Sequence, residues 1–299
     1  MACIQRIQKC ANFGKLLLQK RSFAVAAQQA QRLQKEVTLQ HLDGIDKGVT
    51  VIDLNRVERR NALGVDFVST LNGVVDDVLN NETIKVLIIK SSVPGVFCAG
   101  ADLKERINKS LKESIKLSNT LRGMMNKIHN LPMPVIAAID GTALGGGLEI
   151  ALACDMRVTT KTTKLGLVET RLAIIPGGGG TSRLPRLINP AVAKEMILTA
   201  KIVDGKEALH SGLVNHAVEQ NEKGDAAYQK SLDIAREILP NGPIAVRMAK
   251  FAINKGVEVD LSAASAIEEA CYAQIIPTSD RMEGLIAFSG KRSPKYKGE

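Results

Sequence analysis

The sequence predicts an α/β fold with parallel strand pairing, followed by a helical part, and three observations lead to this prediction. Strand-like apolar runs alternate with amphipathic helical segments from residue 37 to about residue 222, which is typical of strands joined by crossover helices. Beyond residue 222 only helical segments follow. The 299 residues are 45% apolar and 24% charged, a globular composition with enough chain for a sizeable core.

The elements follow one another in a regular order. Two short apolar runs, 37–42 and 49–54, flank a turn-rich segment and indicate a β-hairpin. Period and composition then predict, in chain order, a helix over 61–80, a strand over 85–90, a helix over 111–128, a strand over 134–140, a helix over 147–154 and a strand over 157–160. Four further helices are expected over 224–239, 243–255, 261–274 and 279–288, with a Pro-Asn-Gly-Pro breaker at 240–243.

The positive charge of the chain is concentrated at its N-terminus. The formal net charge is +9, and seven basic residues precede Glu36, the first carboxylate, which leaves +2 (+9 minus 7) for residues 36–299. A basic start without acidic residues is typical of a mitochondrial presequence, and Arg21-Ser22-Phe23 resembles a matrix-protease cleavage site. We therefore expect residues 1–35 to be a presequence and flexible lead, cleaved near residue 23, and a location in the mitochondrial matrix. A basic arm that binds nucleic acid is the alternative.

Several functional classes are disfavoured by what the sequence lacks. No apolar stretch is long enough to span a bilayer, so no membrane partner is expected. The five cysteines form no Cys-x-x-Cys pair and no metal-ligand spacing, which favours reduced thiols and no metal site. Neither a Gly-Lys-Ser/Thr phosphate loop nor a dinucleotide fingerprint after the first core strand is present, and no Gly-x-Ser-x-Gly elbow of a serine hydrolase occurs.

Three stretches follow strand-like runs and are candidates for a functional site. In 96–105, Asp102 and Glu105 fit a capping box that opens a short helix. In 141–149, three glycines at a helix start leave N–H groups free for an anion or an oxyanion, with Glu149 in reach, although an acidic residue there also complements the helix dipole. In 166–180, Glu169 lies in an otherwise apolar loop before a glycine-rich turn and is a candidate site residue. The alternative is a surface carboxylate that pairs with Arg171.

Taken in this order, the three stretches resemble the enoyl-CoA hydratase/isomerase (crotonase) superfamily over nearly all of residues 36–299. The resemblance implies a crotonase/ClpP-like spiral of strand-strand-helix units over 36–222 and a helical oligomerisation domain over 223–299. It further implies a homotrimer or a dimer of trimers. The partner would be an acyl-CoA substrate, and no separate cofactor is expected because coenzyme A is part of that substrate.

The resemblance also assigns roles at the centre of the site. The backbone N–H groups of Ala101 and Gly146 match an oxyanion hole, and Glu149 and Glu169 match the catalytic glutamates. Adding water to an enoyl thioester places negative charge on the thioester oxygen, and each fixed N–H donor there lowers the barrier by about 3 kcal/mol. Glu149 would act as base and Glu169 as acid, while the carboxyl that holds the proton stays open because close carboxyls titrate together. The presence of both glutamates favours a hydratase over an isomerase.

Further positions are implied for the substrate and its CoA part: Arg60, Ala62, Ala99, Gly100, Asp102, Leu103, Lys104, Gly145, Gly177, Phe288 and Lys291. Arg60 and Lys104 would offer cations to the CoA phosphates. Phe288 and Lys291 match positions that in relatives reach the nucleotide of a neighbouring subunit. The chain departs from the pattern at Ser289-Gly290, and a solvated tail cation is the alternative for Lys291.

RNA binding is the other functional class that the resemblance raises, because a similar protein binds AU-rich RNA through a lysine-rich helix. The matching segment here, 61–81, contains three aspartates and no lysine or arginine, so its formal charge is −3. Phosphate contacts supply most non-specific affinity for nucleic acid, and an acidic helix repels phosphate. Seven aromatic residues after Phe23 and no tryptophan do not favour a stacking platform. We expect RNA binding to be weak or not to use this helix.

Overall fold

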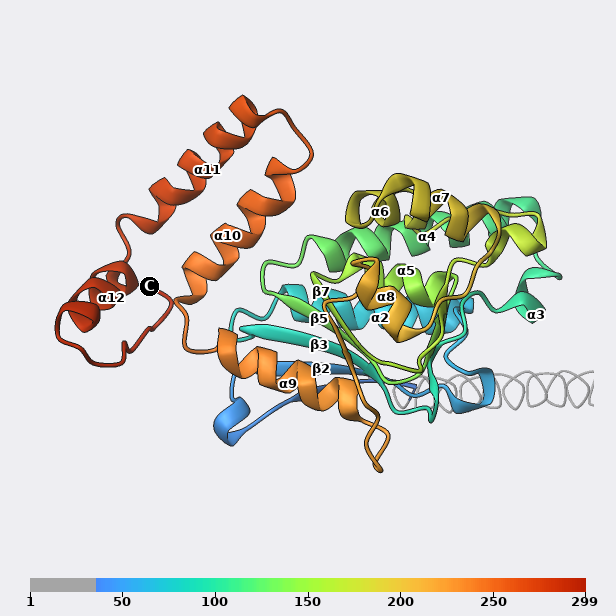
Figure 1. Cartoon of the computed structure of the whole chain (residues 1–299), viewed down its shortest axis with the longest axis horizontal. Helices are drawn as coiled ribbons and strands as arrows, with labels where there is room; N and C mark the ends of the chain where they lie inside the picture. The colour runs from blue at the N-terminus through green and yellow to red at the C-terminus, as the bar shows by residue number, and fades with distance from the viewer. Residues whose placement is uncertain (1–35) are drawn as a thin grey trace, which may run out of the picture.

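The computed structural model describes residues 36–299, so the expected presequence and its cleavage position lie outside the described residues. The larger sheet has six strands, in the order β1 (Val37–His41), β2 (Val49–Leu54), β3 (Val86–Ser91), β5 (Val135–Ile139), β7 (Met156–Thr160) and β9 (His216–Val218) (Figure 1). The strands β1 and β2 pair antiparallel, as the predicted hairpin requires, and every later neighbour pair is parallel. The predicted α/β class with parallel pairing is confirmed.

A smaller sheet of three parallel strands consists of β4 (Val96–Cys98), β6 (Thr142–Leu144) and β8 (Leu165–Gly166). Each of them follows a strand of the larger sheet in the chain, β4 after β3, β6 after β5 and β8 after β7, before the next helix begins. The repeating unit is therefore strand, short strand, helix, as the resemblance implied. Because these short strands are parallel neighbours, their carboxyl ends meet at one edge, where α/β proteins commonly bind ligands.

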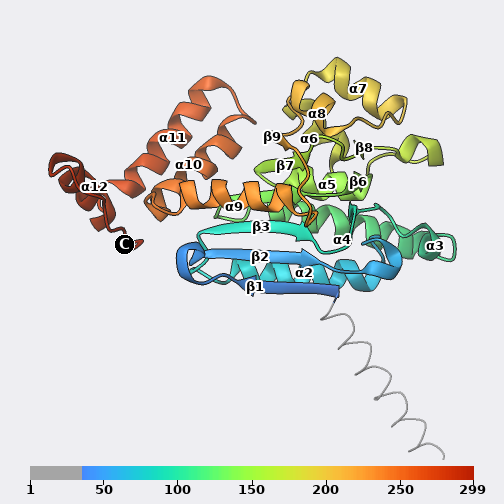
Figure 2. The ribbon, with the colours of Figure 1, turned by 60° about the horizontal axis from the view of Figure 1, so that its bottom comes forward.

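Helices cover both faces of the larger sheet (Figure 2). On one face lie α2 (Val65–Leu79), α4 (Leu111–His129) and α5 (Gly146–Ala153), and on the other lies α9 (Ala226–Ile238). The buried side chains form two hydrophobic clusters, one on each face of the sheet. Along β3, Leu87 and Ile89 belong to the larger cluster, on the face covered by α2, α4 and α5, whereas Val86 and Ile88 belong to the smaller cluster under α9. A strand buried on both faces needs apolar residues throughout, which explains the continuous apolar run in this part of the sequence.

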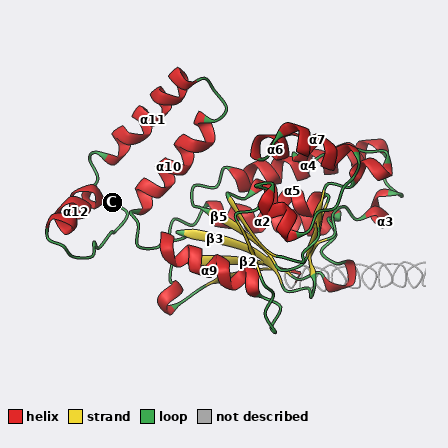
Figure 3. Cartoon of the chain, viewed as in Figure 1, coloured by secondary structure: helices red, strands yellow, loops and turns green. Residues whose placement is uncertain are grey.

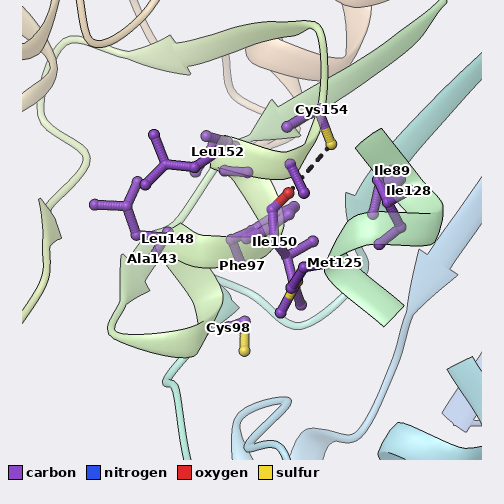
Figure 4. Close-up of a cluster of buried hydrophobic side chains, with 14 of the residues drawn as sticks. Ile89, Phe97, Cys98, Met125, Ile128, Ala143, Leu148, Ile150, Leu152 and Cys154 are labelled. Carbon is purple, nitrogen blue, oxygen red and sulfur yellow. Dashed lines mark hydrogen bonds between the residues drawn. The ribbon is translucent and has the colours of Figure 1, made fainter. Parts of the chain in front are cut away.

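Part of the larger hydrophobic cluster is formed by side chains of α5 and of the segments packed around it (Figure 4). Leu148 and Ile150 of this helix are fully buried with Phe97 of β4. The Cys154 thiol donates a hydrogen bond of 3.4 Å to the carbonyl oxygen of Ile150. Burial raises the pKa of the Cys98 and Cys154 thiols to about 12, so both are neutral side chains of the core.

Helix α2 begins at Val65 and not at residue 61, where the sequence pattern placed its start. Arg60 and Asn61 have φ angles of 52° and 55°, in the left-handed region, so they form a turn and cannot open a right-handed helix. The buried Asn61 side chain holds this turn, because it accepts the N–H of Arg56 at 2.7 Å and donates to the carbonyl oxygen of Phe97 at 2.9 Å. These bonds tie the turn to β4 and to the stretch that follows it.

The last three helices stand to one side of the sheet, as Figures 1 and 3 show. Here α10 (Pro243–Gly256) lies beside α11 (Leu261–Ile275), and α12 (Ser279–Ser289) follows near the C-terminus. Helix α9, which the sequence analysis grouped with these helices, packs on the sheet through Leu232 and Ala235, so the chain leaves the core after α9 and not at residue 222. The connection from β8 to β9 contains α6 (Gly180–Leu187), α7 (Pro190–Leu198) and α8 (Gly205–His210). Within residues 36–299 no helix is long and apolar enough to cross a membrane.

Candidate active site

The three stretches singled out in the sequence meet at the carboxyl ends of β4, β6 and β8. They line one cavity of about 580 Å³. Nine of the expected site residues line it: Ala99, Gly100, Ala101, Leu103, Gly145, Gly146, Glu149, Glu169 and Gly177. A larger groove of about 1080 Å³ lies between α10 and the side of α4 and α6, but neither Glu149 nor Glu169 lines it. The smaller cavity is therefore the candidate active site.

Two backbone N–H groups at this cavity have no acceptor among the described residues, 36–299. Gly100, with a φ of 94°, lies against the next stretch so closely that a Cβ atom there would be 2.8 Å from the carbonyl oxygen of Leu144 and 3.5 Å from the nitrogen of Gly146. The backbone groups on either side of Ala101 are bonded to Leu63. The N–H of Leu63 donates to the carbonyl oxygen of Gly100, and the carbonyl oxygen of Leu63 accepts the N–H of Asp102. Within the part of the chain that the structure describes, the N–H groups of Ala101 and Gly146 donate to no backbone group, and Gly146 is the first residue of α5. These two donors are available to an oxygen atom in the cavity.

Glu149 lies in the first turn of α5, and its side chain is held by a loop that is distant in sequence. The residue is 4% exposed. Its Oε1 atom accepts the backbone N–H groups of Gly178 and Gly180, each at 2.8 Å. Burial raises the pKa of this carboxyl, whereas the two N–H donors and the charges of Arg183 and Arg106 oppose the increase. Donors aimed at one oxygen favour the ionised form and fix its orientation.

Glu169 lies in the 3-10 turn η3 (Glu169–Leu172) and faces the same cavity with fewer partners. A Cβ atom on Gly145 would lie 3.0 Å from its Oε1, and its Oε2 is buried without a hydrogen-bond partner. Burial, and then the negative charge of Glu149, raise the pKa of Glu169 to about 7. Two carboxyls whose environments separate their pKa values are suited to the roles of base and acid. Arg171 does not pair with Glu169, because its Nη2 donates to the carbonyl oxygen of Ala200 at 2.8 Å.

Six of the expected positions do not line this cavity: Arg60, Ala62, Asp102, Lys104, Phe288 and Lys291. The Asp102 carboxylate is engaged within the protein, since it caps α3 (Leu103–Arg106) and forms an ion pair of 3.3 Å with Arg56. The expected capping box is only half formed, because the Glu105 carboxylate accepts the N–H of Val65 at 2.9 Å. Arg60 and Lys104 are exposed, and Phe288, which is 87% exposed, lies on α12 away from the cavity.

Sequence reasoning missed Arg106, Gly178 and Gly180. The glycines matter because the Glu149 carboxylate approaches the backbone closely, and a Cβ atom on Gly178 would lie 2.7 Å from its Oε2. The run of four glycines at 177–180 was the available signal for such an approach. Arg106 has no comparable signal, since a cation in a short helix is most often solvated. Among residues 36–299 no cluster of three or more His, Cys, Asp or Glu side chains could hold a metal ion.

The fold and the site together indicate an enzyme that acts on a substrate with a carbonyl oxygen. Two carboxyls, Glu149 and Glu169, share one cavity with two backbone N–H groups that are available to such an oxygen. The enoyl-CoA hydratase/isomerase family matches residues 44–299, and the chain is a member of this family. The mitochondrial methylglutaconyl-CoA hydratase of Homo sapiens is 55% identical over 268 residues, which cover 90% of this chain and 79% of that protein. The mitochondrial enoyl-CoA hydratase domain-containing protein 2 of Homo sapiens is 53% identical over 264 residues, covering 88% of this chain and 90% of that protein.

A solved structure gives the same result for the fold. The crystal structure of an enoyl-CoA hydratase from Bacillus anthracis superposes with a TM-score of 0.83 at 42% sequence identity, over 88% of this chain and all of that one (100%). The expected family is thereby confirmed. The mitochondrial location expected from the basic N-terminus is confirmed by the mitochondrial relatives.

Proposed function

We propose that the chain adds water to the double bond of an enoyl-CoA thioester, with 3-methylglutaconyl-CoA as its substrate and 3-hydroxy-3-methylglutaryl-CoA as its product, a step of leucine degradation in the mitochondrial matrix. The observation that carries the reaction type is the pair of carboxyls, Glu149 and Glu169, that face one cavity together with two unpaired N–H groups. The choice of acyl group is supported by the likeness to methylglutaconyl-CoA hydratase.

In this proposal the thioester oxygen lies between the N–H groups of Ala101 and Gly146. Withdrawal of electrons towards this oxygen makes C3 of the enoyl group electrophilic and stabilises the enolate that forms when water adds. Each such donor contributes about 3 kcal/mol to lowering the barrier, because it is already oriented when the charge develops. The position of Gly146 at the start of α5 adds the positive end of the helix dipole.

The two glutamates then act as base and acid in the addition of water. Glu149, whose Oε1 accepts the Gly178 and Gly180 N–H groups, removes a proton from water as the water oxygen bonds to C3. The electron pair of the double bond moves to C2, which takes a proton from Glu169. Proton transfer from Glu149 to Glu169, directly or through solvent, restores the starting state. All groups in this scheme belong to the chain or the substrate, so it requires neither a metal nor a separate cofactor.

We further propose that the subunits assemble as a homotrimer or a dimer of trimers through α10 to α12. These helices carry strongly exposed apolar side chains, among them Ile253 at 63%, Leu261 at 83% and Phe288 at 87% exposure. Phe288 and Lys291 would then contact the nucleotide of CoA bound to a neighbouring subunit, with Arg60 and Lys104 near its phosphates. Light scattering after size exclusion should give three or six times the mass of one chain, and a monomer would contradict the assembly.

The catalytic assignment is tested with Glu149→Gln and Glu169→Gln, which keep the size of each side chain. Each should lower kcat by at least about 10²-fold, because a general base or acid is lost, while acyl-CoA binding measured by calorimetry changes little. Glu222→Gln, at an exposed carboxylate, is the matched control and should leave kcat unchanged. Full activity in either of the first two variants would refute the assigned pair.

A second candidate substrate is a short straight-chain enoyl-CoA, as used in fatty-acid oxidation. The relatives leave room for it, because the 53% identity with enoyl-CoA hydratase domain-containing protein 2, whose name specifies no acyl group, is nearly as high as the 55% with methylglutaconyl-CoA hydratase. The ratio of kcat/KM for 3-methylglutaconyl-CoA to that for crotonyl-CoA decides between them. A ratio well above one supports the proposed substrate, and a ratio well below one supports the alternative.

A further inference from the structure

Arg106 is a cation of the active-site cavity whose guanidinium group has no partner among residues 36–299. It is the last residue of α3 and lines the cavity with Glu149 and Glu169. Its Nε atom is buried and lacks a hydrogen-bond partner. In the described range, 36–299, its guanidinium group forms neither a hydrogen bond nor an ion pair, whereas Arg56 is paired with acidic side chains and Arg183 donates to Gly178 and Asn126.

The charge of Arg106 acts on both catalytic carboxyls. It lowers the pKa of Glu149 and that of Glu169, so the guanidinium lies within electrostatic reach of each. Arg122 also lines the cavity, but it is exposed and its Nη1 lies 3.4 Å from the Asn119 side chain. Arg106 is therefore the cation at this cavity that is best placed to meet an anionic group of the substrate near the reacting carbons.

The proposed substrate carries such an anionic group. Its second carboxylate is joined to C3 through a single methylene group, so it must lie close to the place where Glu149 and Glu169 act on C3 and C2. Without a cation, this carboxylate would be repelled by the ionised Glu149. A guanidinium offers two parallel N–H donors that match a carboxylate, and its Nε and Nη groups need acceptors when they are buried.

We propose that Arg106 binds the distal carboxylate of the acyl group and thereby selects a dicarboxylic enoyl-CoA over a straight-chain one. This inference rests on the proposed hydratase function and adds the residue that determines the acyl specificity. A straight-chain acyl group would leave the buried Nε without an acceptor, and sites built to hydrogen-bond a substrate group discriminate strongly against analogues that lack it.

The test compares two substrates that differ only in the carboxylate, 3-methylglutaconyl-CoA and 3-methylcrotonyl-CoA, with crotonyl-CoA as a third. Arg106→Gln should lower the ratio of kcat/KM for 3-methylglutaconyl-CoA to that for 3-methylcrotonyl-CoA by at least about 10²-fold. Loss of the Arg106 charge also raises the pKa of both catalytic carboxyls, but this effect is common to all three substrates and cancels in the ratio. Arg106→Lys, which keeps the charge but not the paired donors, should lose less. Arg122→Gln is the matched control from the same cavity and should preserve the substrate ratio of the wild type.

Each other outcome overturns part of the reasoning in a recognisable way. An equal loss on all three substrates in Arg106→Gln would assign Arg106 to general binding or folding and overturn the inference, while hydration by the wild type would still stand. Unchanged activity on 3-methylglutaconyl-CoA would overturn the inference as well. A wild type that hydrates none of the three substrates would overturn the proposed function, and the inference with it.

Discussion

Replacing Glu169 by glutamine should stabilise the folded protein above pH 7 even though it removes activity. The carboxyl is partly buried in the same cavity as Glu149, and its pKa rises from 4.5 to about 7. The folded state therefore binds this proton more tightly than the unfolded chain does. The resulting stability is complete below about pH 4.5 and is lost as the pH rises towards 7. Above pH 7 the wild type must keep a charge at a place that disfavours it, and Glu169→Gln avoids this charge.

The size of the effect follows from the pKa change. A rise from 4.5 to about 7 sets an upper limit of about 3 kcal/mol. Because Glu169 is only partly buried, solvent screens its charge, and we expect about 1–2 kcal/mol. This amount is a large fraction of the free energy of unfolding of an ordinary domain.

Urea unfolding at two pH values measures the difference. At pH 8 the free energy of unfolding of Glu169→Gln should exceed that of the wild type by about 1–2 kcal/mol, and at pH 5 the two should nearly agree. Glu222→Gln removes an exposed carboxylate of the same type and should shift neither value. The same difference at both pH values, or a loss of stability at pH 8, would refute the placement of Glu169 as a partly buried carboxyl within reach of the charge of Glu149.

Three further predictions concern the acid, the packing of α5 and RNA. In the wild type, kcat/KM should fall as the pH rises above about 7, because Glu169 then loses the proton that it donates, and a flat profile from pH 6 to 9 would contradict this role. Gly147→Ala should destabilise the protein by about 3 kcal/mol or more in thermal or urea unfolding, because its Cβ would lie 2.2 Å from the carbonyl oxygen of Cys98. Gly123→Ala, in α4, has open space around the new methyl group and should stabilise the protein by about 0.5–1 kcal/mol. Residues 24–299 should bind AU-rich RNA weakly, because α2 carries three aspartates and no cation, and a submicromolar, salt-dependent affinity in a titration would count against this expectation.

The main elements of the core could be predicted because their signals are local. The apolar run that forms β3 and the helical spacing in α4 follow from burial of the same residues that carry the pattern. The strands β4, β6 and β8 are two or three residues long and pair only with segments far away in the sequence, so no local period indicates them. Helix α9 was predicted as a helix, but its amphipathic pattern does not say whether its apolar face meets the sheet or another subunit.

The candidate site was predictable to a similar, limited degree. Three glycines at a helix start, with a glutamate two residues after the last of them, indicate a place where backbone N–H groups and a carboxyl can meet. This pattern pointed to Gly146 and Glu149. The partners of the Glu149 carboxylate are 29 and 31 residues further along the chain, and the pattern around Glu149 does not reveal them. The same limitation hid the difference between the two carboxyls, because their pKa values depend on neighbours that only the fold brings together.

That difference is produced by one segment of the chain. Residues 166–180 carry Glu169 near their start and, near their end, the Gly178 and Gly180 N–H groups that hold Glu149. A shift of this segment therefore moves the acid and also weakens the hydrogen bonds that favour the ionised form of the base. Loss of those bonds would leave only the charges of Arg183 and Arg106 to oppose the burial of Glu149, so its pKa would rise further. The weaker negative charge at Glu149 would in turn let the pKa of Glu169 fall. The two carboxyls are thus coupled through the backbone as well as through their charges, so a change in this segment alters both proton positions at once.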